Sequence, residues 1–288
     1  MTIADVLRES STRLHHVSES GSLDAAWLLE HLTGFDHAAQ LLRGEERLRP
    51  ELCDRFSVLV ERRAQGEPIP YIIGTVGFYG RTFLVDERVL VPRPETELVV
   101  EAALDDLRGR RKIGGIVADI GTGSGAIAIT LACELPTLAV YATDISTDAL
   151  TVARRNAAEN NVFQHCTFVH GDLLDPLVKF GEKIDAIVAN LPYIPADLVP
   201  MAPNPVGFEP RVALDGGPDG LDLYRRLLMQ IPNVAAAGAS LFLEAAPGTI
   251  EPLSDLVETM LPGVYVEIGV DYAGCERFVH AVLALTGC

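Results

Sequence analysis

Cysteine is sparse in this sequence, and its distribution excludes two common roles. The five residues are odd in number, far apart and without a CxxC pair, namely Cys53, Cys133, Cys166, Cys275 and Cys288. The pattern argues against a disulfide framework and against a zinc site. We therefore expect reduced and mostly buried thiols, and no metal cofactor.

Long apolar runs are absent as well. No stretch approaches the roughly 20 apolar residues that a membrane-spanning helix needs, and residues 1–16 lack the basic start and the apolar core of a signal peptide. The sequence therefore predicts a cytoplasmic protein with no membrane partner.

Positive charge is also scarce, with 23 Lys and Arg against 40 Asp and Glu and a formal net charge of −17. A protein that binds nucleic acid directly normally has a basic face that displaces counterions from the phosphates. The charge therefore argues against a direct nucleic-acid partner. A composition of 48% hydrophobic and 22% charged residues is typical of an ordered protein. The length of 288 residues predicts one large domain and a smaller one.

The chain begins with helical patterns and then changes character. We expect a small helical bundle over residues 1–66, with one helix that starts at an N-cap Ser22, contains Trp27 in the bundle core and ends at Gly34. Residues 67–94 are rich in β-branched and aromatic residues separated by Gly and Pro, which predicts a β-hairpin linker.

Residues 95–288 begin with a helix and then alternate between strands and helices. Near-continuous apolar strands between amphipathic helices predict an α/β domain whose parallel sheet is covered on both faces. Two strand-like segments near the end, 264–271 and 277–285, lie close together in the sequence and predict an antiparallel pair at the sheet edge.

The first predicted strand ends in a glycine loop, "VADIGTGSGAIAI", in which Asp119 precedes three glycines at alternate positions. Glycines let the backbone turn sharply beside a ligand, and the following helix presents free N–H groups. Asp144 comes 23 residues after Gly121, at the end of the next strand, where an acid reaches ribose hydroxyls. The glycines alone also allow a dinucleotide, but Asp119 and a polar corner after the fourth strand favour S-adenosylmethionine.

That corner is "NLPY", which starts at Asn190 directly after an apolar strand. An amide or aniline-like NH2 group is a poor nucleophile, because its lone pair is delocalised. The Asn190 side-chain oxygen and the Leu191 carbonyl could each accept one N–H and orient the nitrogen. Pro192 would restrict Leu191 to extended backbone, and Tyr193 would offer a flat face to the acceptor.

Longer stretches carry a family resemblance. Residues 23–34, 61–101 and 208–228, which include "LVPRPETE" and "EPRVALDGGPDGL", resemble the protein N5-glutamine methyltransferases of the HemK/PrmC family over nearly the full length. The resemblance implies a class I, Rossmann-like fold with a mostly parallel seven-stranded sheet, and a small helical domain that docks the protein substrate. It also implies methyl transfer from S-adenosyl-L-methionine to the Gly-Gly-Gln glutamine of peptide chain release factors, with S-adenosyl-L-homocysteine as the product.

The loop and the resemblance together assign two sets of site residues. The glutamine contacts are Asn190, Leu191, Pro192 and Tyr193. The methyl-donor contacts are Asp119, Gly121, Thr122, Gly123, Ser124, Gly125, Asp144, Asp172, Leu173 and Asn190.

The sequence departs from the family pattern in two places. Leu191 stands where the family usually has the first Pro of Asn-Pro-Pro-Tyr, and Glu244 lacks the Gly and Gln that commonly follow it. Because of these changes, a second interpretation stays open: the chain is a paralogue that methylates another NH2 group, on a nucleic-acid base, another protein or a small molecule. The charged pairs Arg93/Glu97 and Glu209/Arg211 fit both a closing loop and a structural role.

Overall fold

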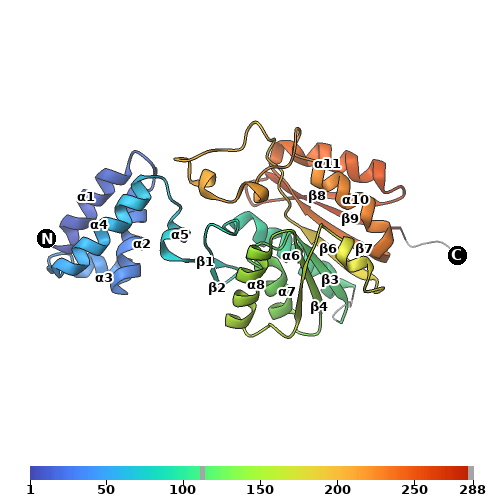
Figure 1. Cartoon of the computed structure of the whole chain (residues 1–288), viewed down its shortest axis with the longest axis horizontal. Coiled ribbons are helices and arrows are strands. Elements are labelled where there is room, and N and C mark those ends of the chain that lie inside the picture. The colour runs from blue at the N-terminus through green and yellow to red at the C-terminus, as the bar shows by residue number, and fades with distance from the viewer. Residues whose placement is uncertain (111–113, 285–288) are drawn as a thin grey trace. The chain divides into compact units, whose positions relative to one another are not determined.

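The computed structural model describes residues 1–110 and 114–284 (Figure 1). The chain divides into two compact units, Met1–Thr75 with Pro200–Glu209 and Val76–Val199 with Pro210–Cys288. The first unit extends beyond the expected end at residue 66 and includes a later segment, because Gly66 lies directly against Pro203. Cys288 and the end of the predicted 95–288 domain lie outside the described residues.

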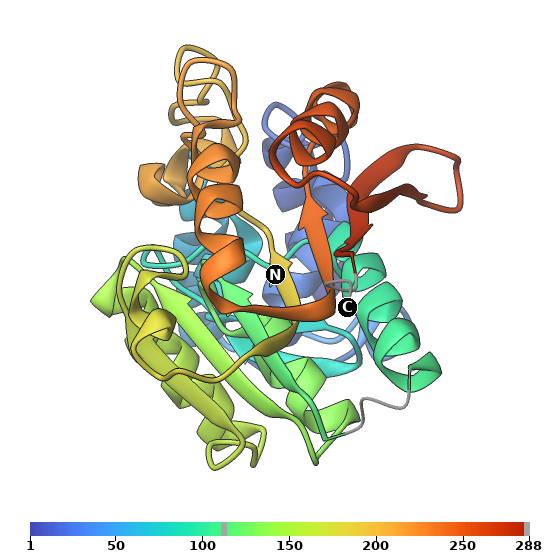
Figure 2. The same ribbon diagram turned by 90° about the vertical axis from the view of Figure 1, so that its right-hand side faces the viewer.

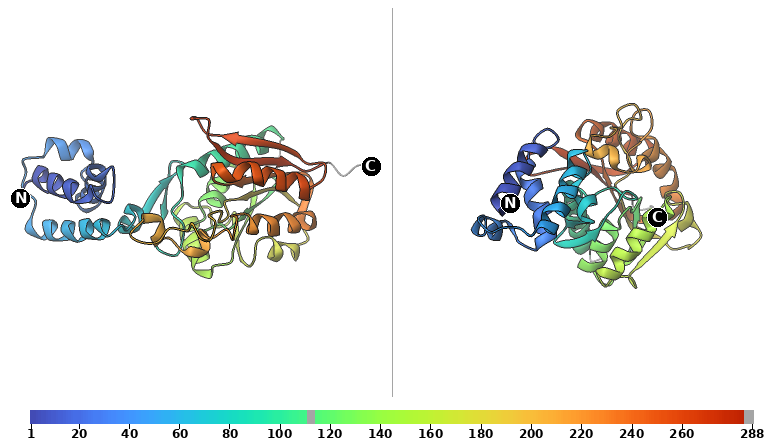
Figure 3. Two further views of the ribbon diagram at one scale, coloured as in Figure 1. Left: turned by 90° about the horizontal axis from the view of Figure 1, so that it is seen from above. Right: turned by 60° about the vertical axis from the view of Figure 1, so that its left-hand side comes forward.

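The first unit is helical, as predicted, and its helices are blue and cyan in Figure 3. Its elements are α1 (Ile3–Leu14), α2 (Gly21–Thr33), α3 (His37–Leu42), α4 (Pro50–Ala64), α5 (Ile69–Ile73) and the 3-10 turn η1 (Pro205–Phe208). Apolar faces of α1, α2, α4 and α5 meet in one core that includes Leu14, Leu28, Leu29 and Phe56. A small bundle of this size buries the apolar stripe that each of these four helices carries.

Two expectations for α2 were wrong and one is confirmed. The helix begins at Gly21, and Ser20 rather than Ser22 is its N-cap. Trp27 is 45% exposed, because it is rotated by about 100° from Leu28 and so lies off the buried stripe. Gly34 ends the helix, as predicted, with a left-handed φ of 72° that glycine adopts without strain.

The second unit contains a hairpin and the main sheet. The hairpin predicted within residues 67–94 is β1 (Thr75–Phe78) and β2 (Arg81–Leu84). The sheet strands are β3 (Ile116–Ile120), β4 (Ala139–Asp144), β5 (Cys166–His170), β6 (Ile184–Ala189), β7 (Ala235–Glu244), β8 (Tyr265–Val270) and β9 (Glu276–Val282). The sheet order is β5-β4-β3-β6-β7-β9-β8.

The sheet confirms the predicted topology. Strands β3 to β7 are parallel, while β9 pairs antiparallel with β7 and β8 at one edge. Figure 2 shows the β8–β9 pair in red at one side of the sheet and the yellow-green strands at the other. The order reverses direction between β3 and β6, and ligands of open α/β sheets bind beyond the strand ends at such a point.

Helices cover both faces of the sheet. They are α6 (Pro94–Gly109), α7 (Ala126–Glu134), α8 (Thr147–Glu159), α9 (Asp175–Val178), α10 (Asp222–Val234) and α11 (Pro247–Met260). The 3-10 turn η2 (Arg211–Ala213) lies between β6 and α10 in the sequence. Alternate strand residues face opposite ways. Val117 and Val188 therefore pack with α6 and α7, whereas Ala118 and Ile187 pack with α10 and α11. No helix in the described residues is both long and apolar enough to cross a membrane.

The described cysteines form no disulfide. Only Cys166 is buried, Cys53 and Cys133 are half-buried, and Cys275 is exposed. The expectation of mostly buried thiols was therefore wrong, because Cys53 of α4 and Cys133 of α7 are only partly buried against their cores and Cys275 lies in the turn before β9.

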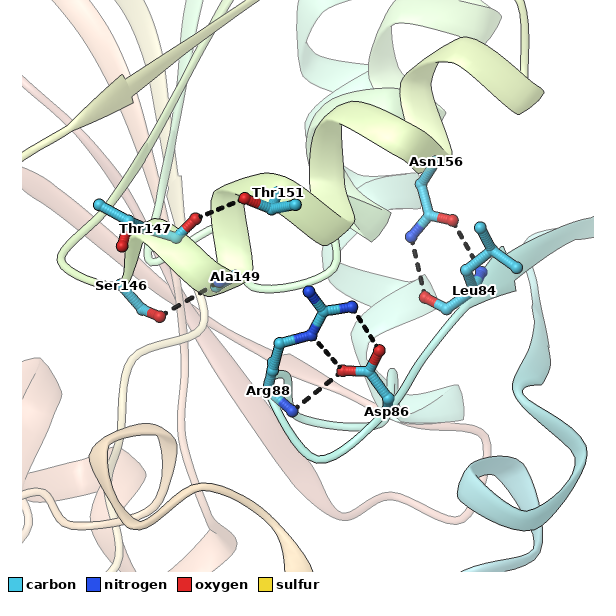
Figure 4. A network of polar contacts seen from close by, with 8 residues as sticks. All are labelled: Leu84, Asp86, Arg88, Ser146, Thr147, Ala149, Thr151 and Asn156. Carbon is cyan, nitrogen blue, oxygen red and sulfur yellow. Dashed lines mark hydrogen bonds and ion pairs between the residues drawn. The ribbon is translucent and has the colours of Figure 1, made fainter.

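Asn156 of α8 ties the hairpin to the glycine loop. Its side chain exchanges two hydrogen bonds with the backbone of Leu84 in β2, of 2.7 and 3.0 Å, as Figure 4 shows. Its Nδ2 also donates to the carbonyl of Ser124 at 2.8 Å. Asn156 is fully buried, so three backbone groups depend on one side chain.

We expect Asn156→Ala to lower the free energy of unfolding by about 2–3 kcal/mol, since it leaves buried backbone groups unpaired. Urea denaturation followed by circular dichroism measures the change. The matched control is Thr151→Ala on the same helix, where an exposed hydroxyl bonds only the Thr147 carbonyl, and we expect a change within about 0.5 kcal/mol. Equal losses in the two variants would contradict this reading of Asn156.

Candidate active site

The glycine loop after β3 takes a backbone path that glycine favours. Gly121, Gly123 and Gly125 have φ values of 72°, 55° and 83°, all in the left-handed region. The N–H groups of Gly121 and Thr122 both donate to the Thr143 carbonyl at 2.9 Å, so the loop is fixed to the end of β4. The loop then leads directly into α7.

Asp119, in strand β3, forms hydrogen bonds that stabilise this loop. Its carboxylate accepts hydrogen bonds from the Thr122 hydroxyl at 2.6 Å and the Ala128 N–H at 3.1 Å. The side chain is completely buried, and burial raises its pKa to about 7 although these two bonds oppose the shift. Both of these hydrogen bonds of the Asp119 carboxyl therefore hold the loop and the start of α7 in place.

Asp144 ends β4 beside the loop. Its carboxylate accepts from the Gly123 N–H at 2.9 Å and from the Ser146 N–H at 2.8 Å. Burial raises the pKa of Asp144, and these N–H bonds act against it. Ser146 in turn caps α8 through the Ala149 N–H, a contact drawn in Figure 4.

A cavity of about 310 Å³ lies at these strand ends, within the range of about 300–1,000 Å³ typical of ligand pockets. The predicted residues that line it are Gly121, Gly123, Asp144, Asp172, Leu173, Asn190, Leu191 and Pro192. Asp119, Thr122, Ser124, Gly125 and Tyr193 are not in the lining. Ile145 and Ala213 add apolar surface that the sequence analysis did not assign.

Leu173 adopts an unusual backbone conformation at the cavity wall. Its φ of 50° is in the left-handed region, which costs a residue with a Cβ about 1–3 kcal/mol. Two neighbouring contacts hold the segment in place: Asp172 forms an ion pair with Arg226, and the Leu174 N–H donates to Gln230 at 2.7 Å. Helix α10 therefore positions this wall.

Asn190 follows β6, the strand that pairs with β3, and lines the same cavity. Its side-chain Nδ2 donates to the Thr96 hydroxyl at 3.1 Å. Thr96 lies in the first turn of α6 and also hydrogen-bonds to the carboxyl group of Glu244 at the end of β7. This arrangement leaves the Asn190 side-chain oxygen for a ligand.

Leu191 is held by a second buried contact. Its N–H donates to the Tyr224 hydroxyl at 3.3 Å, and that hydroxyl donates to the backbone carbonyl of Glu244. Tyr224 is fully buried, and burial raises its pKa well above the ordinary value, so the hydroxyl keeps its proton. Asn190 and Leu191 are thus both connected to Glu244.

Comparisons with known proteins agree with this geometry. The family model described as PrmC N-terminal domain matches residues 5–74, and that described as methyltransferase small domain matches residues 96–198. A release factor glutamine methyltransferase of Moorella thermoacetica is 42% identical over 280 residues, covering 96% of this chain and 97% of the relative. One of Bacillus subtilis is 38% identical over 287 residues, 98% of each chain. The chain belongs to the release factor glutamine methyltransferase family.

Solved structures agree on the fold. The T. thermophilus 16S rRNA methyltransferase RsmC, in complex with AdoMet and guanosine, matches with a TM-score of 0.51 at 17% identity, over 73% of this chain and 49% of that one. A likeness at this identity shows the shared fold alone. The second unit of this release factor glutamine methyltransferase family member therefore has the class I fold of S-adenosylmethionine-dependent methyltransferases, as expected.

Three residues around Asn190 and Leu191 were not predicted, namely Thr96, Tyr224 and Glu244. The sequence carried a weak signal for two of them. Thr96 lies in the specific "PRPETE" stretch, and Glu244 follows the apolar strand "SLFL". A Tyr on the apolar face of a helix gives no such signal, because it has the pattern of an ordinary core residue.

One member of each charged pair has a partner outside the pair. Glu97 accepts from the Tyr79 N–H at 2.7 Å, and Arg211 binds Asp215 at 2.8 Å. Glu209 is buried. No cluster of three or more His, Cys, Asp or Glu side chains within the described residues is arranged to hold a metal ion.

We expect Tyr224→Phe to destabilise this family member by about 1–3 kcal/mol, because the Leu191 N–H and the Glu244 carbonyl both lose a buried partner. Chemical denaturation measures the change. Tyr265→Phe serves as the control, since Tyr265 is 64% exposed and its hydroxyl is accessible to water. A loss no larger than that of the control would show that the Tyr224 hydroxyl does not support the corner.

Proposed function

We propose that this chain transfers a methyl group from S-adenosyl-L-methionine to the side-chain amide nitrogen, N5, of the Gly-Gly-Gln glutamine in peptide chain release factors. The observation that carries the proposal is the position of Asn190, which follows β6, the strand paired with β3, and lines the cavity beside the glycine loop. The curated relatives, named release factor glutamine methyltransferases, support the choice of substrate. The second product is S-adenosyl-L-homocysteine. Because release factors act in translation, we expect the enzyme to work in the cytoplasm.

The residues of the cavity fit a sulfonium nucleoside. Gly121 and Gly123 have no Cβ to occupy space at the loop, and the Asp144 carboxylate can accept the ribose hydroxyls. Ile145 and Leu173 provide apolar walls for a base. The bound donor supplies a methyl group that its positively charged sulfur already activates, so the transfer as proposed needs no metal ion.

The acceptor side supplies orientation. A glutamine amide nitrogen is a poor nucleophile, and the Asn190 side-chain oxygen and the Leu191 carbonyl would each accept one of its N–H groups. These bonds align the nitrogen and strengthen as positive charge develops on it. Pro192 keeps the Leu191 backbone extended. Tyr193 would contact the planar amide as a neutral phenol, since burial raises its pKa to about 12.

Asp144→Ala should weaken the binding of S-adenosylhomocysteine by about 10- to 100-fold, because hydrogen bonds to a charged group contribute about 1.5–3 kcal/mol. Isothermal titration calorimetry measures the dissociation constant. Asp148→Ala is a control on the same segment, since Asp148 is exposed in the first turn of α8 and outside the cavity. Equal affinity of the Asp144 variant and the parent protein would exclude Asp144 from the donor site.

The proposed reaction predicts a 14-dalton gain on one glutamine. The protein is incubated with S-adenosylmethionine and an unmethylated release factor, and the peptide around Gly-Gly-Gln is read by mass spectrometry. We expect the gain with the parent protein and with Asn233→Ala, an exposed position at the end of α10, and its loss with Asn190→Ala. If the protein binds S-adenosylhomocysteine but does not methylate the release factor, the proposed donor site stands and the proposed substrate is wrong.

A further inference from the structure

Two buried polar side chains behind Asn190 have no part in the transfer described above. Thr96 is 4% exposed and Glu244 is 3% exposed. The Thr96 hydroxyl stands between the Asn190 amide nitrogen, at 3.1 Å, and the Glu244 carboxyl group. The Glu244 oxygen Oε2 is buried and has no hydrogen-bond partner in the described part of the chain. A buried polar network that leaves one oxygen without a partner lowers the stability of the fold, so a role in the site is a reason for its presence.

The direction of each hydrogen bond among Asn190, Thr96 and Glu244 follows from the number of protons available. A hydroxyl has one proton to donate, whereas an ionised carboxylate can only accept. While Glu244 is ionised, Thr96 must donate to it, so the Thr96 oxygen must accept from the Asn190 NH2. The Asn190 oxygen then faces the other way. Once Glu244 is protonated it can donate to Thr96, and Thr96 can donate to the Asn190 oxygen with the amide turned round.

We propose that Thr96 and Glu244 are positioning residues that present the Asn190 oxygen to the acceptor NH2 group, and that protonation of Glu244 removes this constraint and lets the amide turn. The inference rests on the proposed function. A turned amide would direct its own NH2 at the NH2 of the glutamine, donor against donor, and the acceptor nitrogen would lose one of its two orienting bonds.

The surroundings of Glu244 put this change in an accessible pH range. Burial raises the pKa of Glu244 to about 7, Glu95 also raises it, and the Thr96 hydroxyl, Arg277 and Arg93 oppose the shift. The charge of Glu244 also helps to raise the pKa values of Tyr193 and Tyr224 above 10, so both hydroxyls stay neutral. Glu244 is therefore ionised above about pH 7. Because the glutamine amide itself does not titrate there, kcat should rise with pH through this region.

The first test needs no methyl acceptor. In protein labelled with 15N at asparagine side chains, the Asn190 NH2 resonances are those missing from Asn190→Ala. We expect them to shift between pH 5.5 and 8.5 in the parent protein and not in Glu244→Gln or Thr96→Val. Resonances that do not respond to pH in the parent protein, or that respond equally in Thr96→Val, would overturn the inference.

The second test is kinetic, with the release factor as substrate and saturating S-adenosylmethionine. Thr96→Val keeps the shape of the side chain and removes the hydroxyl, and we expect kcat to fall on the order of 10- to 100-fold, the scale of a misplaced reacting group, with little change in KM. Thr96→Ser restores a hydroxyl and should recover most of kcat together with the rise with pH. Glu244→Gln should reduce the rise of kcat between pH 6 and 8, whereas any contribution from Asp119, whose pKa is also raised to about 7, is common to the parent protein and the variant.

The outcomes separate this inference from the proposed function. A parent protein that fails to methylate the release factor overturns the proposed substrate, and the resonance titration then decides the role of Thr96 and Glu244. Methylation with equal kcat and equal pH dependence in the parent protein and Thr96→Val overturns the positioning role and leaves the proposed function intact. An equal loss in Thr96→Ser and Thr96→Val would assign Thr96 to packing alone.

Discussion

The acceptor side of the site depends on one residue at the end of β7. Glu244 accepts from Tyr224 through its backbone carbonyl, and its carboxyl group bonds Thr96. Through these two side chains it determines the positions of Leu191 and Asn190. The register of β6 against β7, which pairs Ala189 with Leu243, brings Asn190 beside Glu244. A slip of one residue in either strand would turn the end of that strand to the opposite face, so a fixed register is a precondition for the chemistry.

The donor side follows from the same sheet by a different route. The order reverses between β3 and β6, which leaves a crevice beyond their carboxyl ends. Gly121 follows β3, Asp144 ends β4 and Asn190 follows β6, and all three line one cavity. Parallel pairing therefore brings residues that are far apart in the sequence to one edge of the sheet, and side-chain contacts such as that of Asp144 with the Gly123 N–H add to it. Asn156, through Leu84 and Ser124, then fixes the glycine loop to the hairpin.

The sequence was sufficient where the signal is local. The alternation of strands and helices, the edge pair, the glycine loop and the polar corner each follow from local patterns, and the structure contains them. Thr96 contacts Asn190 across 94 positions, and Tyr224 contacts Leu191 across 33, so no local pattern could predict these bonds. Trp27 shows a related limit, because a large apolar residue next to a buried stripe resembles a member of it unless the rotation between neighbours is counted.

Leu191 can now be interpreted from its contacts. Its side chain is 3% exposed, and its Cδ2 lies 3.0 Å from where a Cβ on Gly121 would stand. The residue that replaces the usual Pro therefore packs against the glycine loop, and its N–H, which Pro would lack, is satisfied by Tyr224. The departure from Asn-Pro-Pro-Tyr thus changes the contact between the donor loop and the corner, while Pro192 and the Leu191 carbonyl remain for the acceptor. The corner therefore accommodates Leu in place of Pro without an unpaired N–H.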